Sequence, residues 1–177
     1  MQDYISFAAK NGVTLADLGS CQFCGANTQR GIHECIEVFS LGFQDIDFSS
    51  LENHRYRFLI VDAHALQHPE IHGRWSNHFH LSRLHLIFRY KVDWSYGLSP
   101  QLSTFLNRNK AKRKDEYLIP PNALDRGNVT STDVREKSEN ETACKNLIES
   151  WAKAVYDKWQ ENHPIVDQIA HAFLKRE

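Results

Sequence analysis

Hydrophobic residues recur at steps of three and four along most of the chain, which is the period of an amphipathic helix. The pattern is clearest in the C-terminal third, where the apolar positions fall on one helical face. These positions are Cys144, Leu147, Ile148, Trp151, Val155 and Trp159. Ser138-x-x-Glu141 has the form of a capping box at the start of this helix. Pro164 then begins a last helix that runs to about Phe173.

The same period predicts four further helices in the first two thirds of the chain. They cover residues 34–46, 53–68, 78–92 and 99–109. Pro69 ends the second, because the residue before a proline disfavours helical backbone, and Ser76 or Asn77 caps the third. No segment shows the strong alternation of a strand. The predicted class is therefore mainly α: a compact single-domain helical bundle of about six helices with an N-terminal loop-rich zinc knuckle.

Glycine and proline interrupt the helical pattern in two segments. Residues 19–31, GSCQFCGANTQRG, are typical of a loop, and residues 117–127, YLIPPNALDRG, predict an ordered non-helical connector. We expect a single domain over residues 1–177 that divides into four parts. These are a metal knuckle at 19–35, a helical region with a histidine-rich stretch at 36–109, a connector at 110–137 and C-terminal helices at 138–177.

Composition narrows the class of protein. The chain has 177 residues, of which 41% are hydrophobic and 24% charged, as in a soluble globular domain. Its net charge of -1 gives no overall field that would attract nucleic acid or an acidic membrane. No apolar run approaches the roughly 18 residues of a membrane span, and the N-terminal MQDYISFAAKNG lacks the apolar core of a signal peptide. We therefore expect a cytoplasmic protein without a membrane partner.

Three of the four cysteines lie close together in the sequence. Cys21, Cys24 and Cys35 fall within 15 residues, whereas Cys144 lies over a hundred residues later. In a reducing compartment a CxxC pair is typical of a metal site or a redox pair. A redox pair would follow an apolar strand, but glycines flank this one, which favours a metal knuckle. Thiolates are the ligands that Zn²⁺ prefers, and the alternative is three reduced, partly buried cysteines.

A fourth ligand is needed to close a tetrahedral zinc site, and two histidines are candidates. His33 lies two positions before Cys35 and gives a workable H-x-C spacing. His68 stands at the predicted helix end before Pro69, where an imidazole can point outward to a loop. We favour His68, because it would tie the knuckle to the helical body. The metal would then be a cross-link that supplies on the order of 10 kcal/mol of folding free energy.

The stretch from Val61 to His85 carries six of the ten histidines and suggests a second kind of site. His64 and His68 share a helical face at positions i and i+4, as in many two-histidine metal sites. The third ligand of such an open, hydrolase-like site would be His72, His78 or His85. There is no HExxH motif, and the candidate general bases have no positional support; they are Asp62, Glu70 and Glu34. The favoured alternative is surface and interface histidines.

Several separated motifs, taken in order, resemble an uncharacterised group of small bacterial proteins, the domain-of-unknown-function family 5946. The motifs are Cys21-Gln-Phe-Cys24-Gly25-Ala26, Cys35-x-Glu37-x-Phe39, Val61-Asp62-Ala63, Ala65-Leu66-Gln67-His68-Pro69, Leu118-x-Pro120-Pro121, Gly127-x-Val129-Thr130, Asp133-Val134 and Trp151-Ala152-x-x-Val155-Tyr156-x-x-Trp159. The resemblance spans about Cys21 to Ile169 and implies no activity. It places the three cysteines and Gln67-His68-Pro69 in the family pattern, which supports His68 as a ligand.

The chain also departs from the family pattern. His64 stands where such proteins tend to carry an aromatic residue, which argues against His64 as a required ligand. Arg57 and Phe58 stand where they tend to carry histidines, so the resemblance leaves open whether a second site exists here.

A basic run follows the predicted helix 99–109. It consists of Arg108, Lys110, Lys112, Arg113 and Lys114. A nucleic-acid patch would need interleaved aromatics or a matching fold, so we favour a solvated loop and consider nucleic acid an unlikely partner.

The leading hypothesis is a small zinc-binding helical protein with a mainly structural metal. It would act as a binding or regulatory module for an unknown protein or small-molecule partner. The alternatives are a metal-dependent hydrolase-like enzyme that uses residues 64–85 and, more weakly, a nucleic-acid-associated factor. The sequence does not indicate the oligomeric state.

Overall fold

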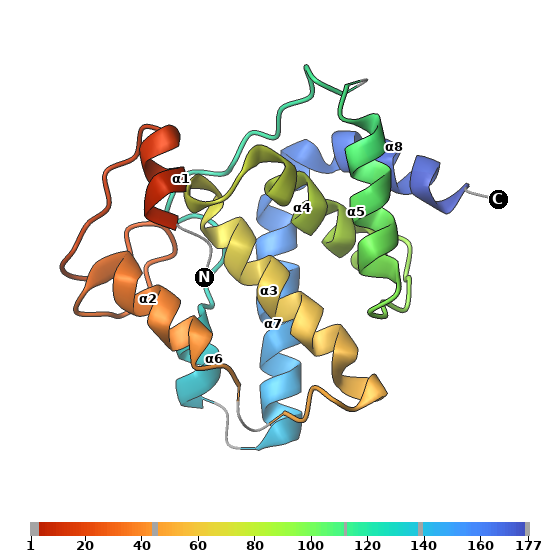
Figure 1. The fold of residues 1–177 in the computed structure, drawn as a ribbon. Helices are drawn as coiled ribbons and strands as arrows, with labels where there is room; N and C mark the ends of the chain where they lie inside the picture. The colour runs from red at the N-terminus through yellow and green to blue at the C-terminus, as the bar shows by residue number, and fades with distance from the viewer. Residues whose placement is uncertain (1–3, 44–45, 112, 138–139, 176–177) are drawn as a thin grey trace.

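The computed structural model describes residues 4–43, 46–111, 113–137 and 140–175, and within these ranges the protein is built from α-helices (Figure 1). The helices are α1 (Tyr4–Lys10), α2 (Gly31–Ser40), α3 (His54–Gln67), α4 (Arg74–Phe88), α5 (Leu98–Asn109), α6 (Ser131–Lys137), α7 (Glu141–Lys158) and α8 (His163–Leu174). Three short 3-10 helices join them: η1 (Leu51–Asn53), η2 (Pro69–Ile71) and η3 (Gln160–Asn162). The mainly α class predicted from the sequence is confirmed.

The hydrophobic core lies where α3, α4, α7 and α8 meet. In Figure 1, α3 crosses in front of α7 at the centre of the molecule, and α3 also packs against α4, which in turn packs against α8. The apolar face predicted for the C-terminal third points into this core. Trp151, Val155 and Trp159 are fully buried there and form part of the core.

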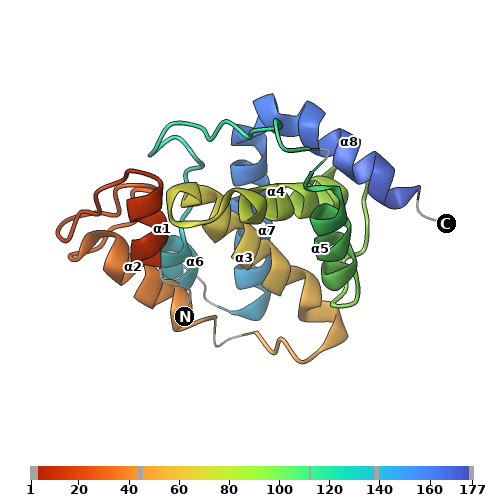
Figure 2. The ribbon, with the colours of Figure 1, turned by 45° about the horizontal axis from the view of Figure 1, so that its top comes forward.

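A second, smaller hydrophobic cluster lies on the N-terminal side of the molecule. Figures 1 and 2 show α1, α2 and the loop between them gathered at one flank of α3, with α6 beside α2. The buried residues of this cluster are Ala8, Cys21, Phe23, Cys24, Ala26, Ile32, Cys35 and Ile71. The cysteines are therefore part of the packing that holds the N-terminal segment together.

The segment between α5 and α6 crosses the molecule without helical backbone over residues 117–127, as predicted, and side chains from elsewhere hold it. The Asn162 side chain accepts a hydrogen bond from the Ile119 backbone N–H at 2.7 Å and donates one to the Ile119 carbonyl at 2.8 Å. The backbone N–H of Leu124 donates to the carbonyl of Phe23 at 2.8 Å. These bonds attach the connector to η3 at one end and to the cysteine loop at the other.

Several predicted helix boundaries were wrong. Helix α2 begins at Gly31 and ends at Ser40, not at residue 46, because Gly42 adopts a positive φ of 73° that a helix cannot continue through. Helix α4 begins at Arg74, with Gly73 before it in the N-cap position, so neither Ser76 nor Asn77 caps it.

Two further differences concern the C-terminal half. The predicted connector contains a short helix, α6, and together with α1 at the N-terminus it raises the number of α-helices in the described residues from the six predicted to eight. Asn140 caps α7 by accepting a hydrogen bond from the Ala143 N–H at 2.9 Å. Ser138 of the expected capping box lies outside the described residues. No described helix is both long and apolar enough to cross a membrane.

Candidate metal centre

The loop between α1 and α2 folds back on itself around the first two cysteines. The Gly25 N–H donates to the Cys21 carbonyl at 2.8 Å, and the Cys21 N–H donates to the Ala26 carbonyl at 2.9 Å. Gly25 has a φ of 76°, a left-handed conformation that glycine adopts without steric cost. This tight turn buries both Cys21 and Cys24 on the inner side of the loop.

The start of α2 positions the third cysteine. Gly31 opens the helix with a φ of 55°, and a Cβ at this position would lie 2.2 Å from the Ala16 carbonyl oxygen. The hydroxyl of Thr28 donates to the carbonyls of both Gly19 and Gly31, at 2.9 and 3.1 Å. Helix α2 is thereby fixed against the loop, and Cys35 enters the cluster one turn later, fully buried.

His68 reaches the same point from the other side, at the C-terminal end of α3. It follows the last helical residue with a non-helical φ of -128°, as the proline at position 69 requires. Its Nδ1 lies 2.7 Å from the His64 carbonyl oxygen. Because a carbonyl can only accept, Nδ1 carries a proton, which leaves Nε2 as the nitrogen that would bind a metal. Metal-binding histidines are commonly oriented in this way.

The four side chains converge with the spacing of a tetrahedral metal site. The Nε2 of His68 lies 3.4 Å from the Sγ of Cys21 and 3.5 Å from that of Cys35, and the Sγ atoms of Cys24 and Cys35 are 3.7 Å apart. Zinc bond lengths give tetrahedral edges of about 3.5 Å between N and S and about 3.8 Å between two S atoms. The four ligand atoms all lie within 4.8 Å of one another. Cys21, Cys24, Cys35 and His68 are therefore placed to bind a metal ion.

The electrostatics of this group favour a cation. The pKa of the Cys21 thiol is well below its ordinary value, because the thiols of Cys24 and Cys35 donate hydrogen bonds to it and the His68 ring adds to the effect. The hydrogen bonds of Cys35 with Cys21 and with Cys24, together with burial, raise the pKa of the Cys35 thiol. Burial lowers the pKa of His68, but the charge of Cys24 and the hydrogen bonds to the thiols outweigh it and raise the pKa to about 10. A metal ion would take the place of these shared protons.

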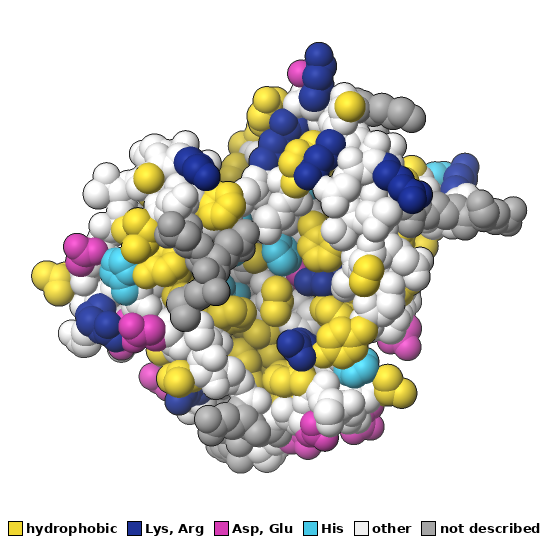
Figure 3. Space-filling view, viewed as in Figure 1, with side chains coloured by type: hydrophobic (Ala, Val, Ile, Leu, Met, Phe, Trp, Pro, Cys, Tyr) yellow, Lys and Arg dark blue, Asp and Glu magenta, His cyan; other side chains and the backbone are white. Residues whose placement is uncertain are grey.

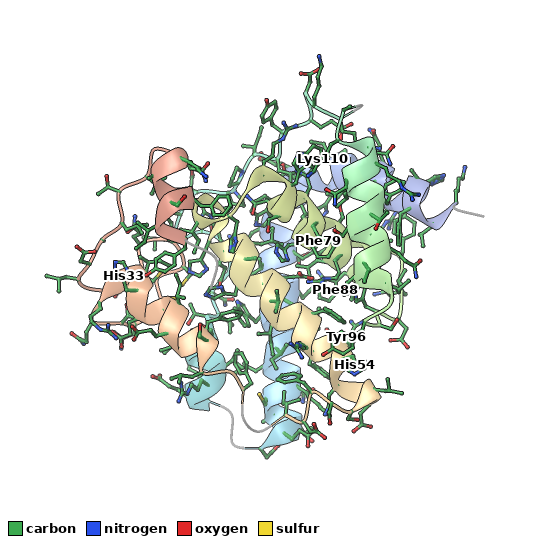
Figure 4. The ribbon with its side chains drawn as sticks, viewed as in Figure 1. His33, His54, Phe79, Phe88, Tyr96 and Lys110 are labelled. Atoms are coloured by element: carbon green, nitrogen blue, oxygen red, sulfur yellow. The ribbon has the colours of Figure 1, made fainter. Side chains whose placement is uncertain are left out.

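His33, the alternative fourth ligand, is directed elsewhere. Its Nδ1 lies 2.6 Å from the Tyr4 hydroxyl and its Nε2 lies 2.9 Å from a carboxylate oxygen of Asp17. Figure 4 shows His33 at the edge of the molecule formed by α1 and α2. Both of its ring nitrogens are thus occupied outside the cysteine cluster.

The remaining histidines of the 64–85 stretch do not assemble into a second group of this kind. His64 is stacked on Phe39 with ring centroids 3.8 Å apart, its Nε2 is buried without a partner, and burial holds its pKa well below the ordinary value. His85 is held between Asp167 and the Tyr156 hydroxyl, each at 3.0 Å. Within the described ranges, the cluster of three cysteines and His68 is the single group with ligand atoms this close.

His72 and His78 lie nearer the surface cavity beside η2. Both ring nitrogens of His72 and the Nε2 of His78 are buried without a hydrogen-bond partner. Burial lowers the pKa of His72 to about 3 and also lowers that of His78. Neither residue joins the metal cluster.

The candidate general bases are engaged in ion pairs or helix capping. Asp62 is fully buried against Arg83 and His80, and Glu70 pairs with Arg126. Glu34 accepts hydrogen bonds from the backbone N–H groups of Gln29 and Arg30, just before α2. Sequence reasoning missed the Asp62–His80–Arg83 cluster. The available signal was the position of Asp62 on the buried side of a helix, where a carboxylate needs a partner.

The basic run surrounds the C-terminal end of α5. Figure 3 shows lysine and arginine side chains gathered there, and Figure 4 places Lys110 at this end of the helix. Arg108 and Lys114 are exposed, Arg113 forms an ion pair with Glu116 at 2.7 Å, and Lys112 lies outside the described residues. The middle of the same face, over α3, is covered by hydrophobic side chains (Figure 3).

The comparisons with known proteins give one match. A family of unknown function, DUF5946, matches residues 19–160, a range that contains all four residues of the cluster. No curated protein and no solved structure matches the chain.

Proposed function

The chain belongs to the DUF5946 family of unknown function, and from the geometry of its cysteine–histidine cluster we propose that it is a zinc protein whose metal is structural. The observation that carries this proposal is the convergence of three thiols and one imidazole at tetrahedral spacing in a buried position. Structural zinc sites have four protein ligands, whereas catalytic sites keep one position for water or substrate.

The donor set supports zinc over calcium or magnesium. Thiolate and imidazole together suit Zn²⁺, and calcium or magnesium would require oxygen ligands. The single imidazole has its other nitrogen fixed on a backbone carbonyl, as expected for a site built to hold one ligand geometry. Both observations concern the residues themselves and do not depend on the family.

The metal would act as a cross-link between three separate parts of the chain. Cys21 and Cys24 belong to the loop, Cys35 belongs to α2, and His68 belongs to the end of α3. A metal held by all four ties the N-terminal flank to the helical core. Because its coordination is complete, we propose that the protein acts as a binding or regulatory module and not through chemistry at the metal.

We also propose that the protein works in the cytoplasm. Its four cysteines are buried and none of them forms a disulfide, and a three-thiolate site requires reduced cysteines. Oxidation of Cys24 and Cys35, whose sulfur atoms are 3.7 Å apart, would remove two ligands at once.

Metal content with stoichiometry on the purified protein tests the proposal. We expect one zinc per chain, lost from C24S and from H68A together with the folded structure of the N-terminal flank, as followed by limited proteolysis. C144A is the matched control, because Cys144 is buried in α7 and lies outside the cluster. Retention of zinc by C24S would overturn the proposal. So would a metal-free wild-type protein that resists the protease as well as the zinc-bound protein does.

A further inference from the structure

A hollow of about 260 Å³ lies on the surface between α4 and α5. Figure 1 shows α5 on the opposite side of the molecule from α2, which carries Cys35. Two aromatic side chains one helical turn apart, Trp75 and Phe79, line the hollow from α4, and Leu106 lines it from α5. Polar side chains complete the lining: Ser76, Ser103 and Asn107. A nucleobase has flat faces that stack on aromatic rings and polar edges that form hydrogen bonds, so this lining suits one base.

The polar side chains of the hollow are available to a ligand. Within the described part of the chain, no hydrogen bond engages the hydroxyls of Ser76 and Ser103 or the amide of Asn107. The same is true of the indole N–H of Trp75. The hydroxyls and the indole N–H are not sealed from solvent, and Asn107 is exposed. A ligand in the hollow can therefore reach donors and acceptors on both helices.

Two cations lie against the aromatic wall of the hollow. The Nζ of Lys110 is 5.9 Å from the centre of the Trp75 ring, and the guanidinium carbon of Arg74 is 5.1 Å from it. Lys110 is exposed and forms no ion pair with the described residues. Figure 4 shows Phe79 beside α5 and Lys110 near the C-terminal end of that helix. A phosphate group attached to a base in the hollow would thus meet positive charge.

The turn after α5 adds a second aromatic ring. The guanidinium carbon of Arg74 lies 3.9 Å from the centre of the Tyr117 ring, so Arg74 contacts both Trp75 and Tyr117. Its Nη2 donates to the backbone carbonyls of Arg113 and Glu116, which fixes the turn beside the start of α4. Tyr117 is 62% exposed. The face of this ring that Arg74 leaves uncovered can receive a second base.

Positive charge predominates on this surface, although the chain as a whole has a net charge of -1. Glu116 is paired with Arg113 at 2.7 Å and adds no free negative charge. Lys114 and Asp115 are both exposed, and their charges offset each other. The charges of Lys110 and Arg74 remain, and Figure 3 shows lysine and arginine side chains gathered in this region. Such a surface attracts a phosphate backbone.

The basic run 108–114 contains no aromatic residue, and for this reason the sequence argued against nucleic acid. The fold supplies the missing rings from other segments: Trp75 comes from α4 and Tyr117 from the connector. Proteins that bind single strands combine a basic surface with aromatic side chains on which bases stack. The structure therefore removes the objection that the sequence raised.

We propose that the hollow between α4 and α5 and the cations beside it bind single-stranded nucleic acid. A base would stack on Trp75 with its edge toward Ser103 or Asn107, and the neighbouring phosphates would lie at Lys110 and Arg74. A duplex would not fit in this way, because its bases are already stacked on one another. The surface is separate from the metal cluster, so the proposal goes beyond the structural role of the metal and is tested independently of it.

Tryptophan fluorescence of the protein as purified tests the proposal. Trp75 is half-buried, whereas the other three tryptophans are buried, so a base stacked on Trp75 should quench the accessible part of the emission. Titration with a deoxythymidine decamer should quench it saturably, with a dissociation constant of roughly 1–100 μM. The affinity should fall as the salt concentration rises. Absence of saturable quenching up to roughly 1 mM decamer would overturn the proposal, whatever the variants show.

Two variants test the stacking. By fluorescence anisotropy of a labelled decamer, W75L should bind about fivefold more weakly or worse, because it loses a base–aromatic contact. Y96L is the matched control. Tyr96 is also an exposed ring beside a cation, with the guanidinium carbon of Arg57 5.6 Å from its centre, but it does not line the hollow. Y96L should bind as the wild type does, and equal weakening in the two variants would overturn the proposal.

Two further variants test the phosphate contact. K110Q should bind the decamer more weakly and lower the slope of log affinity against log salt by about 0.7. R108Q is the matched control, because Arg108 is an exposed cation of the same helix that lines a different hollow, with Gln101 and Thr104. R108Q should keep the wild-type affinity. Equal losses in K110Q and R108Q would mean diffuse attraction and no site at Lys110.

Three competitors identify the ligand. Thymidine monophosphate should displace the labelled decamer at least about tenfold less well than the unlabelled decamer, because it offers fewer phosphates. A duplex decamer and polyglutamate should be at least about fivefold less effective, because neither offers an unstacked base. Equal competition by polyglutamate or by the duplex would indicate a general polyanion surface, and equal competition by the mononucleotide would indicate a nucleotide site. Each of these results would overturn the proposal.

Discussion

The Nε2 of His68 lies 3.5 Å from the Sγ of Cys35, although 33 positions separate the two residues in the sequence. The contact joins the end of α3 to the first turn and a half of α2. Because of this contact, the cysteine cluster is not confined to the N-terminal flank. It forms a site that connects this flank to the helical core.

The first prediction separates the two histidines that the sequence left as alternatives. H68A should lose the metal and the protease resistance of the N-terminal flank. H33A should keep one metal per chain, because its ring contacts Tyr4 and Asp17 and not the thiols. Metal analysis of the two variants side by side measures this. Loss of metal from H33A alone would contradict the placement of His68 as the fourth ligand.

The second prediction concerns the glycine that opens α2. In G31A the new Cβ would lie 2.2 Å from the Ala16 carbonyl oxygen, and the left-handed backbone would be strained as well. Strain of this kind alone costs about 1–3 kcal/mol, and the backbone clash adds to it. Gly42 is the control, because it also has a positive φ but nothing within 4 Å of its Cβ position.

We therefore expect G31A to lower the melting temperature more than G42A and to weaken metal binding, because α2 carries Cys35. Thermal unfolding and a competition titration with a zinc chelator measure the two effects. Equal melting temperatures for the two variants would mean that the loop moves away from Ala16 at little cost.

The third prediction concerns a buried ion pair of the core. Asp62 is fully buried, and the Nε of Arg83 donates to its Oδ2 at 2.7 Å while the Nδ1 of His80 lies 2.6 Å from its Oδ1. D62N would leave the Arg83 charge buried without a counter-charge. Loss of one partner of a buried pair costs about 3–5 kcal/mol. Chemical denaturation of D62N measures this cost.

D157N is the matched control for that measurement. Asp157 forms an ion pair with Lys153 in which both side chains are about half exposed, and such pairs contribute little to stability. We expect its unfolding midpoint to equal that of the wild type. If D62N were as stable as D157N, solvent or another group would be compensating the buried charge of Arg83.

The helical class and most helices could be predicted because they depend on local periodicity. The apolar face of α7 and the end of α3 before Pro69 are visible in the sequence itself. Helix α6 was missed because it has only seven residues. Its start nevertheless carries a signal: the Thr130 N–H donates to the Asp133 carboxylate and the Asp133 N–H to the Thr130 hydroxyl, a reciprocal cap.

The candidate site was predictable in its residue types but not in its geometry. The CxxC turn and Cys35 are local features, whereas the approach of His68 to Cys21 spans 47 positions and depends on how α3 packs. The structural role of the Gln67-His68-Pro69 segment is visible only in the folded protein. Gln67 is fully buried, accepts from the Trp151 indole N–H at 3.1 Å and donates to the Val129 carbonyl at 2.9 Å. These bonds fix the end of α3 from which His68 projects.

The last prediction is a pH dependence caused by His72. Burial, together with the charges of His80 and His68, lowers the pKa of His72 to about 3 in the folded protein, from 6.5 as the ordinary value. The unfolded state therefore binds a proton that the folded state does not between these values. Folding stability is fully present above pH 6.5 and falls as the pH decreases toward 3.

This histidine alone should lower the free energy of unfolding by about 2 kcal/mol between pH 8 and pH 5. H72N cannot take up the proton, so its stability should fall by that much less over the same range. Urea denaturation of both proteins at the two pH values measures how far the free energy of unfolding falls in each. Protonation of the thiols contributes equally to the two proteins and so cancels in the comparison. An identical fall in H72N would show that the His72 ring reaches solvent in the folded state and is protonated there.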